Sequence, residues 1–371
     1  MKKALILLLA ALMLLLVFGC AAQQIEESPT AAPTTTAEVT ATPAPTDFIF
    51  TDSVGRAVEL PVNIEKIAVS GPLAQIVLFA LCPDRFVGVA SAWDAAAEPY
   101  LDTAYYNLPE LGQLYGTKGE LNLESLLASG AQVVIDVGEP KDTIAADLDA
   151  LQAQTGIPFV HITATIETMG DAYRKLGELL NLPTEAEKLA AYCEDLYART
   201  IEIADSVEKA DLLYCLGDTG LNVIAQGTYH AEVIDRLADN LAVMTEPSSK
   251  GTGNEVDMEQ ILLWNPDVIL FAPGSVYATV AADPAWQQVN AIKNGTYYEV
   301  PLGPYNWLGF PPSVQGYLGM MWMAQLLYPD AAHYDLYTEV AEYYRLFYHC
   351  ELTEAQYDAL VANSIGAQTA Q

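Results

Sequence analysis

Apolar positions recur along one face of a long predicted helix between Thr184 and about Val207. Apolar or small residues follow one another there in steps of three and four, which is the spacing of one helix face: Leu189, Cys193, Leu196, Thr200, Ile203 and Val207. Thr184 and Glu187 have the spacing of a capping box, which predicts the start of the helix. We therefore expect one rigid helix in the middle of the chain.

A short pattern occurs once on each side of this helix. Residues 121–127 (Leu-Asn-Leu-Glu-Ser-Leu-Leu) precede it and residues 256–262 (Val-Asp-Met-Glu-Gln-Ile-Leu) follow it. Each copy leads into an apolar strand, at 133–135 and 268–270 respectively. The two halves of the chain are therefore expected to share one architecture.

Segments with the apolar spacing of strands alternate with segments that have the apolar spacing of helices through both halves of the chain. This alternation favours mostly parallel sheets covered by helices. The expected strands are 48–52 paired with 57–61, then 66–70, 86–90, 133–137, 158–162, 211–216, 222–225, 267–271 and 297–300. The expected shorter helices are 125–128, 141–154, 168–180, 229–237, 312–327, 334–348 and 353–363. The predicted fold is α/β, with two α/β lobes joined by a single long backbone helix, a ligand cleft between them and extra C-terminal helices.

The predicted domain boundaries follow from these elements. They are a lipoprotein signal peptide at 1–19, a lipidated Cys20 with a disordered tether at 20–47, an N-terminal α/β lobe at 48–165, connecting helices at 166–209, a C-terminal α/β lobe at 210–330 and a C-terminal helical extension at 331–371.

The first residues indicate export. Lys2 and Lys3 precede an apolar run of about fifteen residues, shorter than the roughly 20 that a membrane span needs. The run closes on Gly19-Cys20, which resembles the lipobox of bacterial lipoproteins. An ordinary signal peptide with a chance cysteine is the alternative. The following residues are rich in Ala, Thr and Pro, a composition that does not bury a core.

Charge excludes one class of partner. The 371 residues carry 48 acidic and 16 basic side chains, a formal net charge of −32, and such a field repels nucleic acid.

The other cysteines are Cys82, Cys193, Cys215 and Cys350, with neither a CxxC motif nor zinc-ligand spacing. We expect buried thiols in preference to disulfides.

The sequence contains no complete motif for a catalytic nucleophile, a metalloprotease or a phosphate-binding loop. The loops at predicted strand ends are instead rich in aromatic residues and glycine. Their candidate ligand contacts are Pro72, Trp93, Tyr115, Gly116, Gly138, Tyr229, Tyr305 and Trp307. Flat rings with polar tips suit a large planar or chelate ligand, although such rings also pack between loops.

Three charged or titratable residues complete the candidate site. His230 lies in a predicted strand-to-helix loop and is the one imidazole placed to contact a metal, although a histidine near the start of a helix more often makes a plain polar contact. No direct metal ligand is otherwise predicted, and no intrinsic cofactor. Lys118 and Lys250, in two glycine-bearing loops, could meet an anionic ligand, or simply be solvated.

Several segments together resemble one family. They are 51–56 (Thr-Asp-Ser-Val-Gly-Arg), Leu60-Pro61, 64–67 (Ile-Glu-Lys-Ile), 123–126 (Leu-Glu-Ser-Leu), 265–269 (Asn-Pro-Asp-Val-Ile) and 286–300 with its Asn294-Gly295 turn. Over residues 48–330 the chain resembles the substrate-binding lipoproteins of ABC importers for iron-siderophore, haem and cobalamin, some members of which take molybdate or tungstate. The C-terminal addition and the loop 303–307 depart from the common pattern.

The resemblance implies a function that composition did not. It implies an extracytoplasmic, lipid-anchored, monomeric protein that is not an enzyme, captures an iron chelate, haem or a corrinoid, and delivers it to a membrane permease with its ATPase. The alternatives are a molybdate or tungstate binder, an unrecognised secreted hydrolase and a structural surface protein. Matching glutamates of the family dock on the permease, and here they are Glu124 and Glu259 in the two copies of the short pattern.

Overall fold

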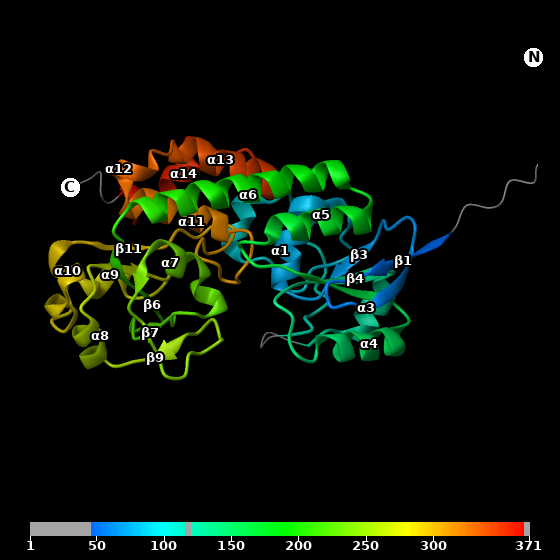
Figure 1. Ribbon diagram of the computed structural model, residues 1–371, viewed down its shortest axis with the longest axis horizontal. Helices are drawn as coiled ribbons and strands as arrows, with labels where there is room; N and C mark the ends of the chain where they lie inside the picture. The colour runs from blue at the N-terminus through cyan, green and yellow to red at the C-terminus, as the bar shows by residue number, and fades with distance from the viewer. Residues whose placement is uncertain (1–45, 116–119, 367–371) are drawn as a thin grey trace, which may run out of the picture. The chain divides into compact units, whose positions relative to one another are not determined.

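The computed structural model describes residues 46–115 and 120–366. The predicted Cys20, signal peptide and most of the tether lie outside these residues, as do Gly116 and Lys118. From Pro45 onward the chain forms one unit, and within it two α/β lobes are joined by a long helix, as predicted (Figure 1).

The N-terminal lobe is built on a parallel sheet in the order β3-β4-β5, preceded by an antiparallel hairpin of β1 and β2. The three strands of the parallel sheet are fully or largely buried, as expected when helices cover a parallel sheet. The elements are β1 (Asp47–Thr51), β2 (Ala57–Pro61), β3 (Ile67–Val69), α1 (Pro72–Leu81), α2 (Thr103–Tyr106), α3 (Leu123–Ser129), β4 (Val133–Gly138), α4 (Ile144–Thr155) and β5 (Phe159–Thr163).

The C-terminal lobe carries a mixed sheet in the order β11-β10-β6-β7-β9, with β8 also paired to β6. Strands β6, β8, β10 and β11 run parallel, and β7 and β9 are antiparallel to their neighbours. The elements are β6 (Asp211–Leu216), β7 (Asn222–Val223), α7 (Glu232–Leu237), β8 (Asp239–Asn240), β9 (Asn254–Glu255), α8 (Met258–Trp264), β10 (Val268–Phe271), α9 (Tyr277–Val280), α10 (Asn290–Asn294) and β11 (Tyr297–Glu299).

Helices α5 (Met169–Leu180) and α6 (Pro183–Ser206) connect the lobes. The predicted central helix is confirmed as α6, which contacts α1 and α5 at one end and α7 and α11 at the other. The predicted capping box is wrong. The helix starts at Pro183, after Leu182, without a side-chain cap, and Glu187 instead pairs with Arg174, with Oε2 2.8 Å from Nε.

The two copies of the short pattern fold alike. Asn122 and Asp257 cap α3 and α8, each side chain accepting a hydrogen bond from the backbone N–H three residues on, at 2.9 and 2.8 Å. Both helices end in a left-handed residue, Gly130 or Asn265, the two residue types that adopt this conformation most readily. Each then leads into a buried central strand, β4 or β10.

The C-terminal helices pack on the same side of the sheets as α6 (Figure 1). They are α11 (Gly316–Leu327), α12 (Pro329–Ala332), α13 (Leu336–Phe347) and α14 (Glu354–Val361). Helix α14 begins with a capping box of Thr353 and Gln356. Their aromatic residues belong to the main core, with Trp322, Tyr343 and Tyr344 fully buried.

One predicted strand is wrong. Residues 86–90 make only isolated bridges, Ile67 with Phe86 and Val89 with Glu110. Their buried apolar side chains pack in the core, although the segment forms no continuous ladder of hydrogen bonds with a neighbouring strand.

Cys82, Cys193, Cys215 and Cys350 are free thiols, the first three buried. Among the described residues, no helix combines the length and apolar character needed to cross a membrane.

Candidate ligand site between the lobes

A small pocket lies where the two lobes meet. Its volume is about 20 Å³, room for about one water molecule. Three segments line it: the start of the connection after β5, the residues around the start of α7, and the loop before α11. The lining residues are Ile166, Met169, Tyr229, His230, Glu232, Val233, Leu308, Gly309, Pro312, Ser313 and Gly316.

Hydrogen bonds hold these segments together. The hydroxyl of Tyr229 donates to the carbonyl of Ala164 at 3.1 Å, and the hydroxyl of Tyr317 on α11 donates to the carbonyl of Ile166 at 2.6 Å. These two hydrogen bonds connect the C-terminal lobe to the segment that leaves the N-terminal sheet.

His230 places an imidazole in this pocket. Its ring stacks on Phe310, with centroids 4.9 Å apart and planes 27° apart. Burial lowers the pKa of His230, an effect that the carbonyl of Gly309 opposes, so the ring is neutral at pH 7. Its Nδ1 is buried and has no hydrogen-bond partner in the part of the chain that the structure describes, a costly arrangement unless a ligand or water satisfies it.

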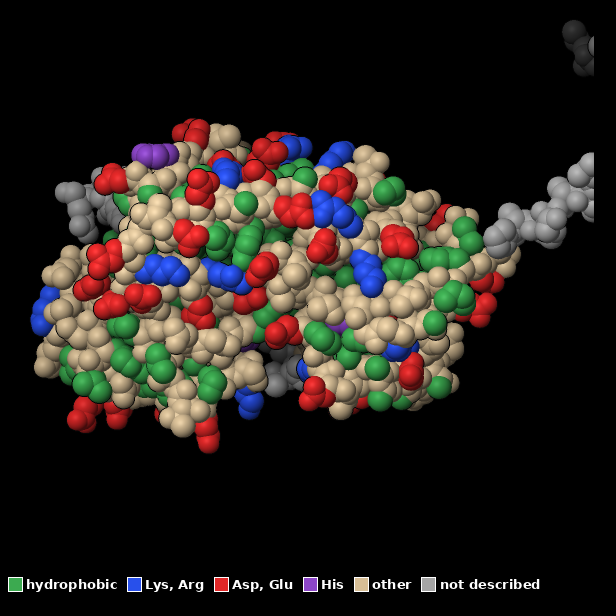
Figure 2. Space-filling view, in the orientation of Figure 1, with side chains coloured by type: hydrophobic (Ala, Val, Ile, Leu, Met, Phe, Trp, Pro, Cys, Tyr) green, Lys and Arg blue, Asp and Glu red, His purple; other side chains and the backbone are tan. Residues whose placement is uncertain are grey.

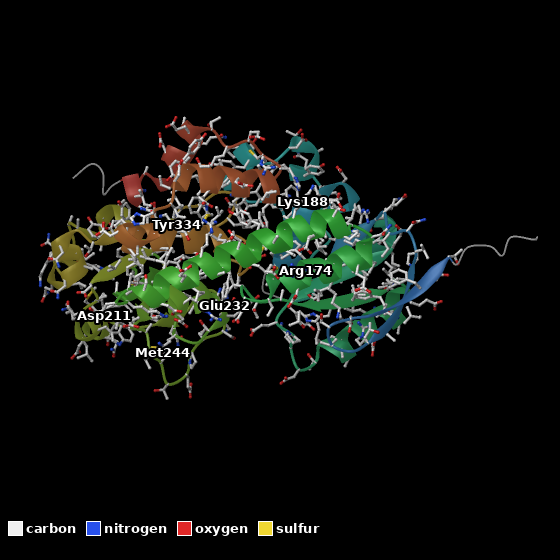
Figure 3. All side chains as sticks on the ribbon, turned by 45° about the horizontal axis from the view of Figure 1, so that its top comes forward. Arg174, Lys188, Asp211, Glu232, Met244 and Tyr334 are labelled. Carbon is white, nitrogen blue, oxygen red and sulfur yellow. The ribbon has the colours of Figure 1, made fainter. Side chains whose placement is uncertain are left out.

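Glu232 is the first residue of α7 and lines the same pocket. Burial raises the pKa of Glu232 to about 7, while a hydrogen bond from the backbone N–H of Ile166 acts in the opposite direction. The charges of Glu139 and Glu167 also raise this pKa, and that of Arg236 lowers it. Figure 3 shows Glu232 below the middle of α6.

The pocket is poor in positive charge. Among the described residues that line it, none is Lys or Arg. Arg236, the cation that stabilises ionised Glu232, is itself paired with Glu167, with Nη2 2.8 Å from Oε2. Acidic side chains are also spread over the visible face of the molecule, which is hollowed between the lobes (Figure 2).

Comparison with known proteins decides the family. The model of a family described as periplasmic binding protein matches residues 93–302, which is more than half of the chain. The chain belongs to the periplasmic binding protein family. No curated protein matches it.

Solved structures agree with the family. An ABC transporter solute-binding protein from Sulfurospirillum deleyianum is 26% identical, with a TM-score of 0.77 over 84% of this chain and 98% of that one. A periplasmic solute-binding protein from Veillonella parvula is 25% identical, with a TM-score of 0.72 over 85% and 98%. The molybdate-binding MolA of Haemophilus influenzae, at 22% identity and a TM-score of 0.66 over 83% and 99%, shares the fold.

These findings give the general role. The protein is an extracytoplasmic substrate-binding protein of an ABC transporter, it works with a membrane permease, and it is not an enzyme.

Two predicted rings of this periplasmic binding protein meet each other. Trp93, from the N-terminal lobe, and Tyr305, from the loop before α11, have centroids 5.8 Å apart. Trp93 is only 5% exposed, packs on Phe79 at 5.0 Å and donates from Nε1 to the carbonyl of Tyr105 at 3.2 Å. This pair of rings connects the two lobes within the main hydrophobic core. Neither ring is among the residues that line the pocket.

The prediction that Trp307 lines the cleft is wrong. Its side chain is fully buried and donates to the carbonyl of Gly303 at 3.2 Å, so the ring supports its loop from within. Tyr115 is half-buried, and its hydroxyl donates to Asp147 at 2.7 Å. The ammonium of Lys141 lies 3.5 Å from the Tyr115 ring centroid.

The other predicted residues are dispersed. Pro72 begins α1, and Gly138 ends β4 with φ of 139°, a value that favours glycine. Lys250 is exposed in the loop before β9, and Glu124 and Glu259 are exposed in the first turns of α3 and α8.

Of the predicted ligand contacts, the pocket brings together Tyr229 and His230. The sequence patterns do not predict the other polar or loop residues of the pocket, which are Glu232, Leu308, Gly309, Pro312 and Ser313. The one feature of the sequence that could have indicated Glu232 as a pocket residue is its position, two residues after His230 at the start of a helix.

Proposed function

We propose that the protein captures a metal chelate, an iron siderophore, haem or a corrinoid, in the cleft between its lobes and delivers it to its permease. The observation that carries the proposal is the composition of the pocket. It offers the Nδ1 of His230, the ring of Tyr229 and the carboxyl of Glu232, and among the described residues that line it there is neither Lys nor Arg. Such groups accept hydrogen bonds or contact a metal complex more readily than they neutralise a free anion.

The fold by itself does not choose the ligand. Distantly similar structures are described with molybdate in Haemophilus influenzae, with nickel and histidine in Helicobacter pylori, and as haem-binding in Roseiflexus. The choice therefore depends on the side chains of this chain.

A small oxyanion such as molybdate or tungstate is the second candidate. The observation that favours it is the pocket volume of about 20 Å³, which is far below the roughly 300–1,000 Å³ of drug-sized ligand sites. A chelate requires the lobes to separate further, whereas an oxyanion requires donors from backbone N–H groups or from Lys118 or Lys250.

Binding measurements separate the two candidates. The affinities for a ferric trihydroxamate, haemin, cobalamin, molybdate and tungstate can be measured by titration calorimetry. We expect the protein to bind at least one of the metal chelates and neither of the two oxyanions. His230→Ala should weaken chelate binding by about tenfold, because it removes the half-buried ring and its buried Nδ1. His333→Ala, in the turn after α12, is the matched control and should bind as the parent does. Binding of molybdate or tungstate alone would refute the chelate proposal.

We also propose that Cys20 carries the lipid anchor, as the Gly19-Cys20 junction suggests. Cys20→Ala should move the protein out of the membrane fraction or block its processing. A variant that stays with membranes at full mature size would contradict the anchor.

A further inference from the structure

Glu232 is a pocket residue that the general role of the protein does not explain. It lies on the C-terminal lobe, yet its carboxyl is in contact with the backbone N–H of Ile166, in the segment leaving the N-terminal sheet, which lowers the pKa of Glu232. A carboxylate has two oxygens and about four acceptor positions. This one contact therefore leaves acceptor capacity for a ligand.

Among the described residues, the surrounding charges leave Glu232 without a counterion of its own. Glu139 follows β4 of the N-terminal lobe, and Glu167 follows Ile166; both act on Glu232 through their negative charges. Arg236 acts in the opposite sense but is shared with Glu167, at 2.8 Å. Because a partly buried carboxylate is costly when it lacks a partner, a positive or N–H-bearing ligand group would relieve that cost.

A second group in the same pocket needs a partner. The buried Nδ1 of His230 makes no hydrogen bond to any described residue, and the neutral ring can accept one from a ligand N–H or O–H. Within the described residues no group of three or more His, Cys, Asp or Glu side chains could hold a metal ion. The positive or donor group therefore belongs to an organic ligand or to the organic part of a chelate.

We infer that Glu232 is the specificity-determining residue of the cleft, selecting a chelate that presents a positive charge or N–H donors to the pocket and disfavouring anionic chelates and oxyanions. The inference rests on the proposed function and narrows it. Amide-bearing corrinoids and cationic hydroxamate chelates fit this charge class. The carboxylates of haem and the oxygens of molybdate meet repulsion from Glu139, Glu167 and the ionised form of Glu232.

A pair of chelates that differ in one charge tests the inference. Ferrioxamine B is a ferric trihydroxamate with a free ammonium group, and its N-acetylated form is neutral with the same metal cage. The parent protein should bind the ammonium form about tenfold more tightly, since a charge-assisted hydrogen bond is lost on acetylation. Glu232→Gln keeps an acceptor for the Ile166 N–H and should reduce that preference to less than threefold. Glu202→Gln, which removes an exposed charge from α6, should keep the full preference.

The outcomes distinguish this inference from the proposed function. Equal binding of both forms by the parent, an undiminished preference in Glu232→Gln, or binding of haemin alone would overturn the role of Glu232 while chelate capture stands. Binding of molybdate alone, or of none of these probes, would overturn both. A thermal unfolding midpoint of Glu232→Gln within a few degrees of the parent shows that the comparison concerns binding and not folding.

Discussion

At the scale of single residues, Glu232 shows local and tertiary effects acting in opposite directions. As the first residue of α7, its ionised form is favoured by the helix dipole, typically by about 0.3–1 kcal/mol. Burial nevertheless raises its pKa to about 7, so the loss of hydration is the larger effect. The residue is therefore better suited to contact a ligand than to stabilise the free protein.

This balance predicts a pH dependence of stability. The pKa of Glu232 is raised in the folded protein, from 4.5 to about 7, so the folded state holds the proton more tightly than the unfolded state. Its stabilising contribution is complete below pH 4.5 and is lost as the pH rises through 7. It amounts to at most about 3 kcal/mol. Urea unfolding at pH 5 and pH 8 should therefore show a larger loss of unfolding free energy for the parent than for Glu232→Gln.

The comparison with Glu232→Gln isolates one group, because all other titrating residues are common to both proteins. Glu202→Gln should reproduce the pH profile of the parent. Parallel profiles for the parent and Glu232→Gln would mean that Glu232 ionises as freely in the folded protein as in the unfolded chain.

At the scale of elements, the periodicity of apolar residues predicts whether a segment is a helix or a strand. It is a poorer guide to where the element begins and to which side chains are buried. The long repeat of α6 was recognisable because its buried face continues over many turns. Its start was misplaced because Pro183, at the first helical position, made the Thr184 cap unnecessary. Phe86 and Val89 are buried as a strand would bury them, but no neighbour pairs with them continuously. The sequence could not determine on which side of its loop Trp307 lies, since only packing decides that.

The two helices that carry the predicted docking glutamates share a further feature. Leu127 on α3 and Leu263 on α8 are 53% and 77% exposed, and each lies three or four residues after its glutamate, on the same face of its helix. Large exposed apolar side chains next to a charge are typical of protein interfaces. Each lobe thus offers a carboxylate and a leucine together.

We predict that these faces dock on the permease. Glu124→Arg combined with Glu259→Arg should leave ligand affinity within about twofold and abolish stimulation of the transporter ATPase in reconstituted vesicles, because rim charges set docking more than ligand affinity. Glu65→Arg with Glu208→Arg changes the net charge equally at other exposed sites and should couple normally. If the Glu124 and Glu259 variant also couples normally, the two carboxylates only stabilise helix ends.

At the scale of the whole described unit, the C-terminal helices bridge the lobes on the side of α6. On the N-terminal lobe, the imidazole of His349 lies 3.1 Å from the Phe79 carbonyl and Gln356 donates to the Pro99 carbonyl at 3.4 Å. On the C-terminal lobe, Asn363 donates to Glu299 at 2.7 Å. The extension therefore holds both lobes at once, which restricts how far the cleft can open without breaking contacts.

Phe347 of α13 offers a test of whether the C-terminal helices hold the two lobes together. It is 1% exposed, stacks on Tyr343 with centroids 4.3 Å apart and meets the edge of Tyr192 on α6 at 5.4 Å. Phe347→Ala should cost about 3–5 kcal/mol, as is usual for a buried phenylalanine, and should loosen the attachment of α13 to both lobes. Phe159→Ala makes a similar hole in β5, within the N-terminal lobe alone.

Hydrogen exchange distinguishes the two variants. Because α13 contacts both α1 and α11, Phe347→Ala should raise amide exchange in both of these helices, on either side of the cleft. Phe159→Ala should raise exchange mainly in β4 and β5, to which its strand belongs, and leave α11 protected. Were Phe347→Ala to increase exchange only within α13 and α14, the extension would be an independent appendage, and the opening of the cleft would be limited by α6 and the pocket contacts alone.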